Sequence, residues 1–295
     1  MRHDLQTLKA FIAIADEGSI ARAAERENTV ASALSKRLAE MEHVCGTDLV
    51  IRHRRGVSLT PAGVELVVHA RRVMVELGQL ENSLSGFVSG VRGQIRLIAN
   101  TSAIVQFLPA DIAKFAEVHP TIKIDLEELT SEQVQKQVQD GLADIGVMVA
   151  NKPLDALVCR PYRTDHLYVM MPAGHPLAKA KKLRFADTLD FDHVGLPRGT
   201  SLCESILAAA YNTGKPLKLR MQTTSFDGLR RMVGSGLGIG ILPAGCVLPF
   251  LKVEGLVACP LDEPWAERQL LIVTRERHTL TRVAGLLADH LAQPG

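Results

Sequence analysis

The segment from residue 18 to residue 63 limits the fold of this chain more than any other part of the sequence. It predicts a short alanine-rich helix over 20–26, a turn at 27–29, a second helix over about 30–44, and then a basic hairpin. A turn of three or four residues between two short helices is the spacing of a helix-turn-helix. With a hairpin behind it, this order predicts a winged helix-turn-helix that grips DNA.

Local signals mark the helix ends around this segment. An earlier helix over 5–15 presents apolar residues at helical spacing. Ser19 and Thr29 are expected to cap the two helices that follow. The dipeptide Thr60-Pro61 predicts the start of a long helix over 61–89, because a threonine hydroxyl suits the N-cap and proline suits the first helical position.

The hairpin joins two predicted strands, 49–51 and 57–59. Its loop holds three arginines and a closing glycine: Arg52, Arg54, Arg55 and Gly56. A charge run is usually a solvated surface, but directly after a helix-turn-helix we interpret it as a wing against DNA phosphates. Residues 1–89 contain eleven Lys and Arg and eleven Asp and Glu, so the argument rests on where the charges lie.

The predicted helix over 61–89 carries apolar residues at a strict four-three spacing, the a/d seam of three heptads. The seam consists of Leu66, Ala70, Val73, Leu77, Leu80, Leu84 and Phe87. So narrow a stripe needs a partner, either the second domain of the chain or a second copy. We favour a parallel or antiparallel dimer.

From residue 93 onward, strands and helices alternate. Strands are predicted over 95–99, 122–126, 145–149, 167–171, 194–196, 217–222, 239–242 and 270–273, and helices over 107–118, 131–142, 202–211, 226–233 and 280–292. The order β-α-β-α-β favours a parallel sheet with right-handed crossovers, and it occurs twice. The fold class is therefore multi-domain α/β, ending in two lobes with a cleft between them.

Three parts follow from these patterns. Residues 1–60 are the winged helix-turn-helix, 61–89 the linker and dimerisation helix, and 90–295 the two-lobed domain, with a connecting segment at 89–93. Lobe I is expected over about 90–163 and 268–295, and lobe II over about 164–267.

Composition excludes several other classes of protein. The chain is 46% hydrophobic and 22% charged, which is ordinary for a soluble globular protein. No apolar run reaches the roughly 18 residues of a membrane span, and the N-terminus lacks the apolar core of a secretory signal, so we expect a cytoplasmic protein. Five cysteines without a Cys-x-x-Cys pair argue against disulfides or zinc, and we expect no metal or cofactor.

Together these parts resemble the LysR-type transcriptional regulators over the whole chain. The resemblance rests on short motifs in order: Ala15–Ser19, Ala23-Ala24, Ser32–Ser35, Leu59–Gly63, Leu108-Pro109, His119-Pro120, Gly141–Gly146, His175–Leu177 and Gly236–Pro243. Each motif is weak alone, whereas their order and spacing are specific. The resemblance implies a regulatory domain like a periplasmic binding protein, and two dimers that join as a tetramer and bend DNA.

The candidate DNA contacts are Ser19, Arg22, Ser32, Ser35, Lys36, Arg37, Arg52, Arg54 and Arg55. We assign Ser32 and Lys36 to base edges and the others to phosphates, with an ion pair to a neighbouring acid as the alternative for Arg22. Members of this family often have a Ser/Thr-Gln pair where this chain has Val30 and Ala31, which offer only apolar contact. A dimer is expected to bind an inverted repeat.

The effector site is expected in the cleft, beyond the carboxyl ends of the strands. Candidate effector-binding residues are Thr101, Ser102, Thr130, Met148, Thr200, Ser201 and Phe226. Hydroxyls and N–H groups at helix starts suit a carboxylate, so a small organic anion is expected. The alternative is that Ser102, Ser131 and Ser201 are plain helix caps.

The sequence thus predicts a DNA-binding transcriptional regulator with a small-molecule effector. RNA polymerase is a further candidate partner, and a membrane is not. The alternative is an α/β enzyme or small-molecule-binding protein with an accessory DNA-binding domain. Ten scattered histidines have no metal or triad spacing, and Gly234–Gly240 precedes a strand, where a dinucleotide loop would follow one. A transport binding protein would leave residues 1–89 unexplained.

Overall fold

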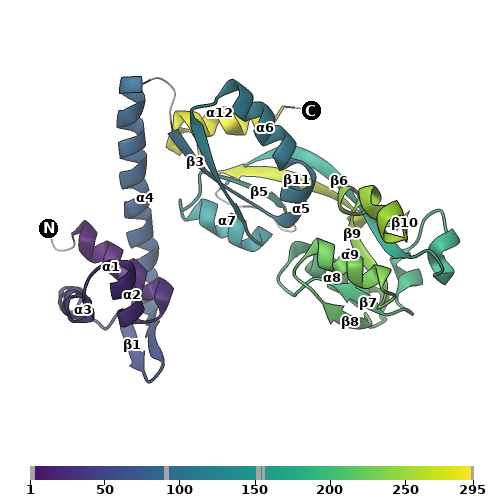
Figure 1. The fold of residues 1–295 in the computed structure, drawn as a ribbon, viewed down its shortest axis with the longest axis horizontal. Helices are drawn as coiled ribbons and strands as arrows, with labels where there is room; N and C mark the ends of the chain where they lie inside the picture. The colour runs from purple at the N-terminus through teal and green to yellow at the C-terminus, as the bar shows by residue number, and fades with distance from the viewer. Residues whose placement is uncertain (1–3, 90–92, 151–153, 155–156, 294–295) are drawn as a thin grey trace. The chain divides into compact units, whose positions relative to one another are not determined.

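The computed structural model describes residues 4–89, 93–150, 154 and 157–293, without the side chains of residues 79, 81–89 and 277. The predicted connecting segment at 89–93 lies largely outside these residues. The chain divides into two compact units, the first made of residues 1–90 with 140–142 and the second made of residues 91–139 and 143–295. Figure 1 shows the helices and strands of both units.

The first unit is a winged helix-turn-helix, as predicted. Its elements are α1 (Leu5–Glu17), α2 (Ile20–Arg26), α3 (Ala31–Cys45), β1 (Val50–His53), β2 (Gly56–Leu59) and α4 (Pro61–Ser89). Apolar side chains of α1 to α3, among them Phe11, Ile14 and Leu34, form its core with residues from α4. One local prediction was wrong: Val30, and not Thr29, is the N-cap of α3, and its side chain makes no capping hydrogen bond.

The wing is held against the turn between α1 and α2. Gly18 adopts a left-handed conformation at the end of α1, and its carbonyl accepts a hydrogen bond of 2.9 Å from the Val57 N–H. A side chain at Gly56 would bring its Cβ within 2.2 Å of the same carbonyl oxygen. Glycine is therefore required there for the wing to approach the helices closely.

Lobe I of the second unit contains one mixed sheet. The strands β3 (Gly93–Ala99), β4 (Ile122–Glu128) and β5 (Ile145–Val149) are parallel, with β3 in the middle. The strand β11 (Glu267–Thr274) then pairs antiparallel with both β5 and β6 (Val158–Pro172). The predicted parallel pairing is confirmed for β3, β4 and β5. The sheet as a whole is mixed, because β11 runs against β5 on one side and against β6 on the other. The helices of this lobe are α5 (Thr101–Gln106), α6 (Leu108–Val118), α7 (Ser131–Gln139) and α12 (Arg282–Leu291).

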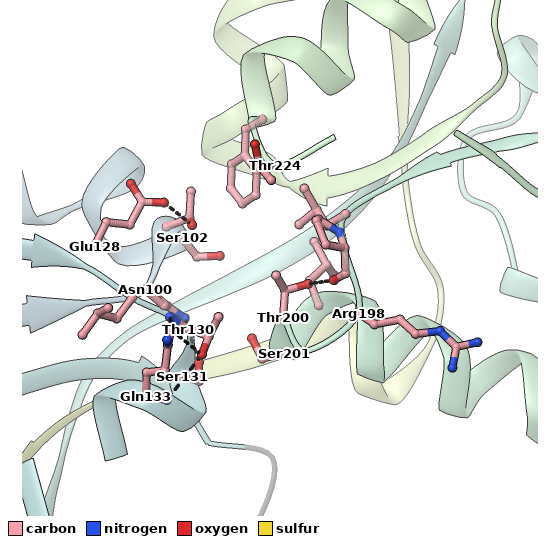
Figure 2. A pocket seen from close by; sticks show the side chains of 16 residues that line it. Asn100, Ser102, Glu128, Thr130, Ser131, Gln133, Arg198, Thr200, Ser201 and Thr224 are labelled. Carbon is pink, nitrogen blue, oxygen red and sulfur yellow. Dashed lines mark hydrogen bonds between the residues drawn. The ribbon is translucent and has the colours of Figure 1, made fainter. Parts of the chain in front are cut away.

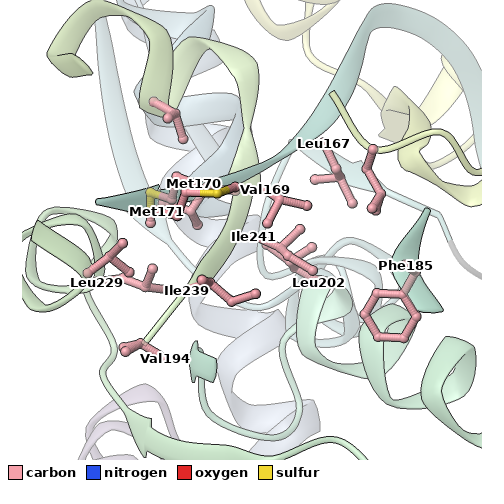
Figure 3. Packing of buried hydrophobic residues seen from close by; sticks show 14 of the residues in the cluster. Leu167, Val169, Met170, Met171, Phe185, Val194, Leu202, Leu229, Ile239 and Ile241 are labelled. Carbon is pink, nitrogen blue, oxygen red and sulfur yellow. The ribbon is translucent and has the colours of Figure 1, made fainter. Parts of the chain in front are cut away.

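Lobe II continues from the second half of β6. That half pairs antiparallel with β9 (Gly240–Pro243) and β10 (Leu256–Pro260), while β7 (His193–Gly195) pairs parallel with β8 (Leu219–Gln222). Its helices are α8 (Ser201–Thr213), α9 (Phe226–Gly234), α10 (Ala244–Val247) and α11 (Leu251–Glu254). Figure 3 shows its core, in which Leu167 and Val169 of β6 pack with Ile239 and Ile241.

Five short 3₁₀ turns complete the second unit: η1 (Pro176–Lys179), η2 (Phe185–Thr188), η3 (Leu248–Phe250), η4 (Pro264–Ala266) and η5 (Arg277–Thr279). The five cysteines of the chain are all free thiols. Among the described residues, no helix is both long enough and apolar enough to cross a membrane.

Candidate functional sites

The wing presents its arginines to solvent. Arg52, Arg54 and Arg55 are exposed, and none of them forms an ion pair with a described residue. The loop is shorter than predicted, because β1 and β2 pair from Val50 with Leu59 to His53 with Gly56. Arg52 therefore lies on β1, and only Arg54 and Arg55 form the turn of the hairpin. Such unpaired guanidinium groups are available to neutralise phosphates.

The arginines on the helices are placed differently. The guanidinium of Arg22 donates to the Glu17 carbonyl and lies 3.6 Å from its carboxylate. Arg37 donates a 3.1 Å hydrogen bond to the Gln6 amide and lies 4.0 Å from Asp4. Both candidates therefore have partners within the unit. For Arg22 this is the predicted alternative, in which it pairs with a neighbouring acid.

The remaining candidates on α2 and α3 differ in their exposure to solvent and in their contacts within the unit. The Ser19 hydroxyl accepts from the Arg22 N–H at 3.4 Å and caps α2. Ser32 is exposed and Ser35 is half-buried. Lys36 is exposed, and its only ion pair with a described residue is a 3.9 Å contact with Glu40. At the start of α3, the apolar side chain of Val30 is 63% exposed.

The predicted seam on α4 falls into two parts. Ala70 is 1% exposed and belongs to the core of the first unit, with Leu66 packed against it. Further along, Leu77 is half-buried, and Val73 and Leu80 are exposed by 44% and 54%. The side chains of Leu84 and Phe87 lie outside the described residues. The first part of the seam thus serves the unit's own core, and the second part presents apolar side chains to solvent.

The second unit contains a cavity of about 330 Å³ between residues of its two lobes (Figure 2). Six of the seven predicted effector residues line it: Thr101, Ser102, Thr130, Thr200, Ser201 and Phe226. The seventh, Met148, does not line this cavity. It is 3% exposed in a core cluster with residues of α7 and borders a neighbouring cavity.

Helix starts surround this cavity because the polar caps lie at the ends of the connecting loops. Thr130 caps α7, Thr200 caps α8 and Ser225 caps α9, each through its side-chain oxygen. The alternative interpretation, in which Ser102, Ser131 and Ser201 are the helix caps, was therefore wrong. Asn100, Thr130 and Thr200 make those bonds instead.

The hydroxyl groups of the cavity already have protein partners. Thr101 donates to the Glu128 carboxylate at 2.6 Å, and Thr200 donates to the Pro197 carbonyl at 3.0 Å. Thr130 donates to the Gln133 amide oxygen at 3.0 Å. These bonds hold the hydroxyl oxygens in fixed positions, which is the preorganisation that a binding site requires.

A buried network lies behind Ser102. The guanidinium of Arg268 donates to the Ser102 hydroxyl at 3.2 Å and pairs with Asp165, its Nε lying 2.8 Å from Oδ1. Gln106 joins the network, since its amide nitrogen donates to Asp165 at 3.0 Å and its amide oxygen accepts from the Gly245 N–H at 3.1 Å. The network thus ties α5 of lobe I to the joining strands β6 and β11 and to α10 of lobe II.

Burial also sets the chemistry of Cys203, which follows the lining residue Leu202. Burial and then the neighbouring Glu204 carboxylate raise the pKa of the Cys203 thiol. Its thiolate is therefore disfavoured at neutral pH, and the cavity has no nucleophile from this cysteine.

Ten residues that line the cavity were not predicted to bind the effector. They are Asn100, Glu128, Leu129, Ser131, Gln133, Leu196, Pro197, Arg198, Leu202 and Thr224. Glu128 is the most consequential, because it is a carboxylate inside the cavity. It was missed because β4 was predicted to end at residue 126, whereas the strand runs to Glu128 and carries it to the sheet edge.

Comparisons with known proteins agree with this architecture. Residues 5–64 match the family of bacterial regulatory helix-turn-helix proteins of the lysR family, and residues 89–294 match the LysR substrate binding domain. The uncharacterized HTH-type transcriptional regulator YbhD of Escherichia coli (strain K12) is 28% identical over 290 residues, which cover 96% of this chain and 89% of YbhD.

Solved structures share the fold. The crystal structure of full-length CbnR complexed with its target DNA has a TM-score of 0.75 at 17% identity, covering 98% of this chain and 99% of that one. Full-length OxyR of Pseudomonas aeruginosa has a TM-score of 0.70 at 23% identity, covering 99% and 95%. The family models span both units, and these relatives are regulators, not enzymes. The chain therefore belongs to the LysR family of DNA-binding transcriptional regulators, with a helix-turn-helix domain and an effector-binding domain.

Proposed function

We propose that a small organic anion bound in the cavity of the second unit controls this regulator. The observation that carries the proposal is the meeting of three helix N-termini, those of α7, α8 and α9, at one cavity. N–H groups at the start of a helix are short of partners and carry partial positive charge, so they favour a carboxylate or another anion. A volume of about 330 Å³ suits a small metabolite.

Binding across the cavity would favour one arrangement of the lobes. Thr101 and Ser102 belong to lobe I, and Thr200 and Ser201 belong to lobe II, so one ligand can touch both. A ligand that binds the closed arrangement more tightly shifts the population towards it. The change reaches the operator through the DNA-binding unit, which is allosteric control in the thermodynamic sense.

On DNA, the proposed contacts are the wing arginines with phosphates, and Ser32 and Lys36 of α3 with base edges. Two copies joined through Val73, Leu77 and Leu80 would read an inverted repeat, and two such dimers would form a tetramer. The protein would act in the cytoplasm, where bacterial DNA lies, and RNA polymerase is a further proposed partner.

A thermal-shift screen of small carboxylates tests the effector proposal. A carboxylate that raises the melting temperature of the full chain should do so less in Thr200→Val and in Ser102→Ala. Thr213→Val is the matched control, because Thr213 donates to the Ala210 carbonyl at the far end of α8. Equal shifts in all four proteins would contradict binding in this cavity.

Sedimentation equilibrium tests the seam. Leu80→Asp should weaken self-association by at least about tenfold, because it puts a charge into an apolar contact. Val64→Asp makes a similar change on α4 at an exposed residue outside the four-three spacing and should leave the oligomer intact. If both variants behaved like the wild type, the apolar stripe of α4 would not be the dimer contact.

A further inference from the structure

The charges that line the cavity do not fit a plain anion. Its lining contains one carboxylate, that of Glu128, and one guanidinium, that of Arg198. In Figure 2, Arg198 is directed away from the labelled side chains around the cavity. No described residue forms an ion pair with Glu128, whose known partner is the Thr101 hydroxyl at 2.6 Å from Oε1. The cavity therefore combines partly positive helix starts with an uncompensated carboxylate.

The neighbouring cavity contributes further negative charge. It shares Ser131 and Ser201 with the first cavity, and its lining includes Glu132 and Glu204. Among the described residues that line it, none is a lysine or an arginine. Glu204 is partly engaged, since its carboxylate accepts from the Gly199 N–H at 3.0 Å. A ligand with two carboxylates would bring like charges together on this side, which is costly at short range.

We propose that the effector carries an ammonium group as well as a carboxylate, as an amino acid does, and that Glu128 binds the ammonium. This inference rests on the proposed effector role of the cavity. The carboxylate of the ligand takes the N–H groups at the start of α8, and its ammonium donates to the Glu128 carboxylate opposite. A charge-assisted hydrogen bond is about twice as strong as a neutral one, so the pair discriminates strongly against a ligand without the amine.

The simpler role for Glu128 is to hold the Thr101 hydroxyl. Glu128→Gln separates the two roles, because a glutamine oxygen still accepts from Thr101 while the negative charge is gone. Glu128 is exposed, so this variant is not expected to disturb folding. Glu127→Gln is the matched control, since Glu127 precedes it on β4, is also exposed and does not line the cavity.

The experiment compares matched pairs of ligands on the full-length protein by calorimetry. The probes are the common L-amino acids and, for each, the acid that lacks the amine, such as glutarate for L-glutamate and propionate for L-alanine. In the wild type and in Glu127→Gln, at least one amino acid should bind about tenfold or more tightly than its amine-free partner. In Glu128→Gln that preference should disappear, with weaker binding of the amino acid and tighter binding of the amine-free acid.

Two results would overturn the inference and leave the proposed function standing. One is that no amino acid binds the wild type more tightly than its amine-free partner, although some of these probes bind. The other is a preference for the amino acid that survives in Glu128→Gln. If no probe of either kind bound the wild type, both the inference and the anion site itself would fail.

Discussion

The wing of the first unit and the joining strands of the second unit both carry arginines, in opposite surroundings. Arg54 and Arg55 are exposed and have no ion pair with a described residue. Arg268 on β11 is 5% exposed, pairs with Asp165 and reaches the Ser102 hydroxyl. An unpaired surface cation adds little to stability and is free for a partner molecule. A buried cation costs much desolvation, which an opposite charge and hydrogen bonds must offset. Asp165 and Ser102 do so at Nε and Nη2 of Arg268, whereas its Nη1 has no hydrogen-bond partner among the described residues.

The two units should therefore respond differently to substitutions of polar residues. In the first unit, polar surface groups are available to DNA, and removing them should change binding while leaving the fold intact. In the second unit, buried polar groups hold the lobes together behind the cavity, and removing them should change stability first.

The largest effect is expected for Asp165→Ala, which leaves the Arg268 guanidinium buried without its carboxylate. The free energy of unfolding of the second unit should fall by about 3–5 kcal/mol. Urea denaturation of the full chain measures it. Asp190→Ala is the control, because it breaks an exposed 3.5 Å pair with Lys215 and should cost less than about 1 kcal/mol. Equal losses in the two variants would remove the distinction between buried and exposed pairs.

The next effect concerns His193 in the core of lobe II. Burial lowers the pKa of His193 from 6.5 to about 4, against the opposing effects of the Phe191 carbonyl and the Asp192 carboxylate. The unfolded chain therefore binds the extra proton between pH 6.5 and about 4. The stability that comes from the neutral ring is complete above pH 6.5 and is lost as the pH falls towards 4, by roughly 2–3 kcal/mol.

Denaturation at pH 7 and at pH 5 measures this loss. The stability of the wild type should drop more between the two values than that of His193→Gln, which has no titrating ring. The same drop in both proteins would mean that His193 does not contribute to the acid sensitivity.

A smaller change in free energy is expected when Arg54 and Arg55 are both replaced by alanine. Affinity for DNA from the upstream region of the gene should fall about tenfold or more. The slope of log K against log salt should decrease by about two, because two phosphate contacts are lost. Fluorescence anisotropy at several salt concentrations measures both. Arg26→Ala is the control, since Arg26 already pairs with Asp16 at 3.0 Å. An unchanged slope in the double variant would exclude the wing from the DNA contact.

The smallest effect is expected for Val30→Ser at the start of α3. Serine supplies the capping hydrogen bond that valine lacks, so the unfolding free energy of the first unit should rise by about 0.5–1 kcal/mol. Binding to operators that differ at one base pair should also change, because an exposed apolar side chain is lost. A more stable variant with unchanged operator preference would mean that Val30 does not touch a base.

Most of the first unit could be predicted because its signals are local. The Ser19 cap predicted the start of α2, the turn at 27–29 predicted its end, and Thr60-Pro61 predicted the start of α4. The sequence pattern could not show which apolar residues of α4 are buried within the unit. That burial depends on tertiary packing, since Ala70 shares a core with side chains of α1 to α3.

The effector domain could be predicted only in part. The alternation of strands and helices located most strands. Six of the seven residues predicted to bind the effector line one cavity. The antiparallel pairing of β11 with β5 and β6 was not predicted, because pairing between residues more than a hundred positions apart leaves no trace in local periodicity. For the same reason nothing in the sequence joined Arg268 to Asp165 and Ser102.

The position of β11 also bears on how the chain is made. This strand, residues 267–274, lies between β5 and β6 in the sheet of lobe I. During synthesis all helices and strands of the DNA-binding unit are complete by residue 89 and can fold early, since domains fold as units from the N-terminus. Lobe I has to wait until residues 267–274 have left the ribosome. A chain that stops before β11 would therefore keep a folded DNA-binding unit and expose the open edges of β5 and β6, which are prone to aggregation.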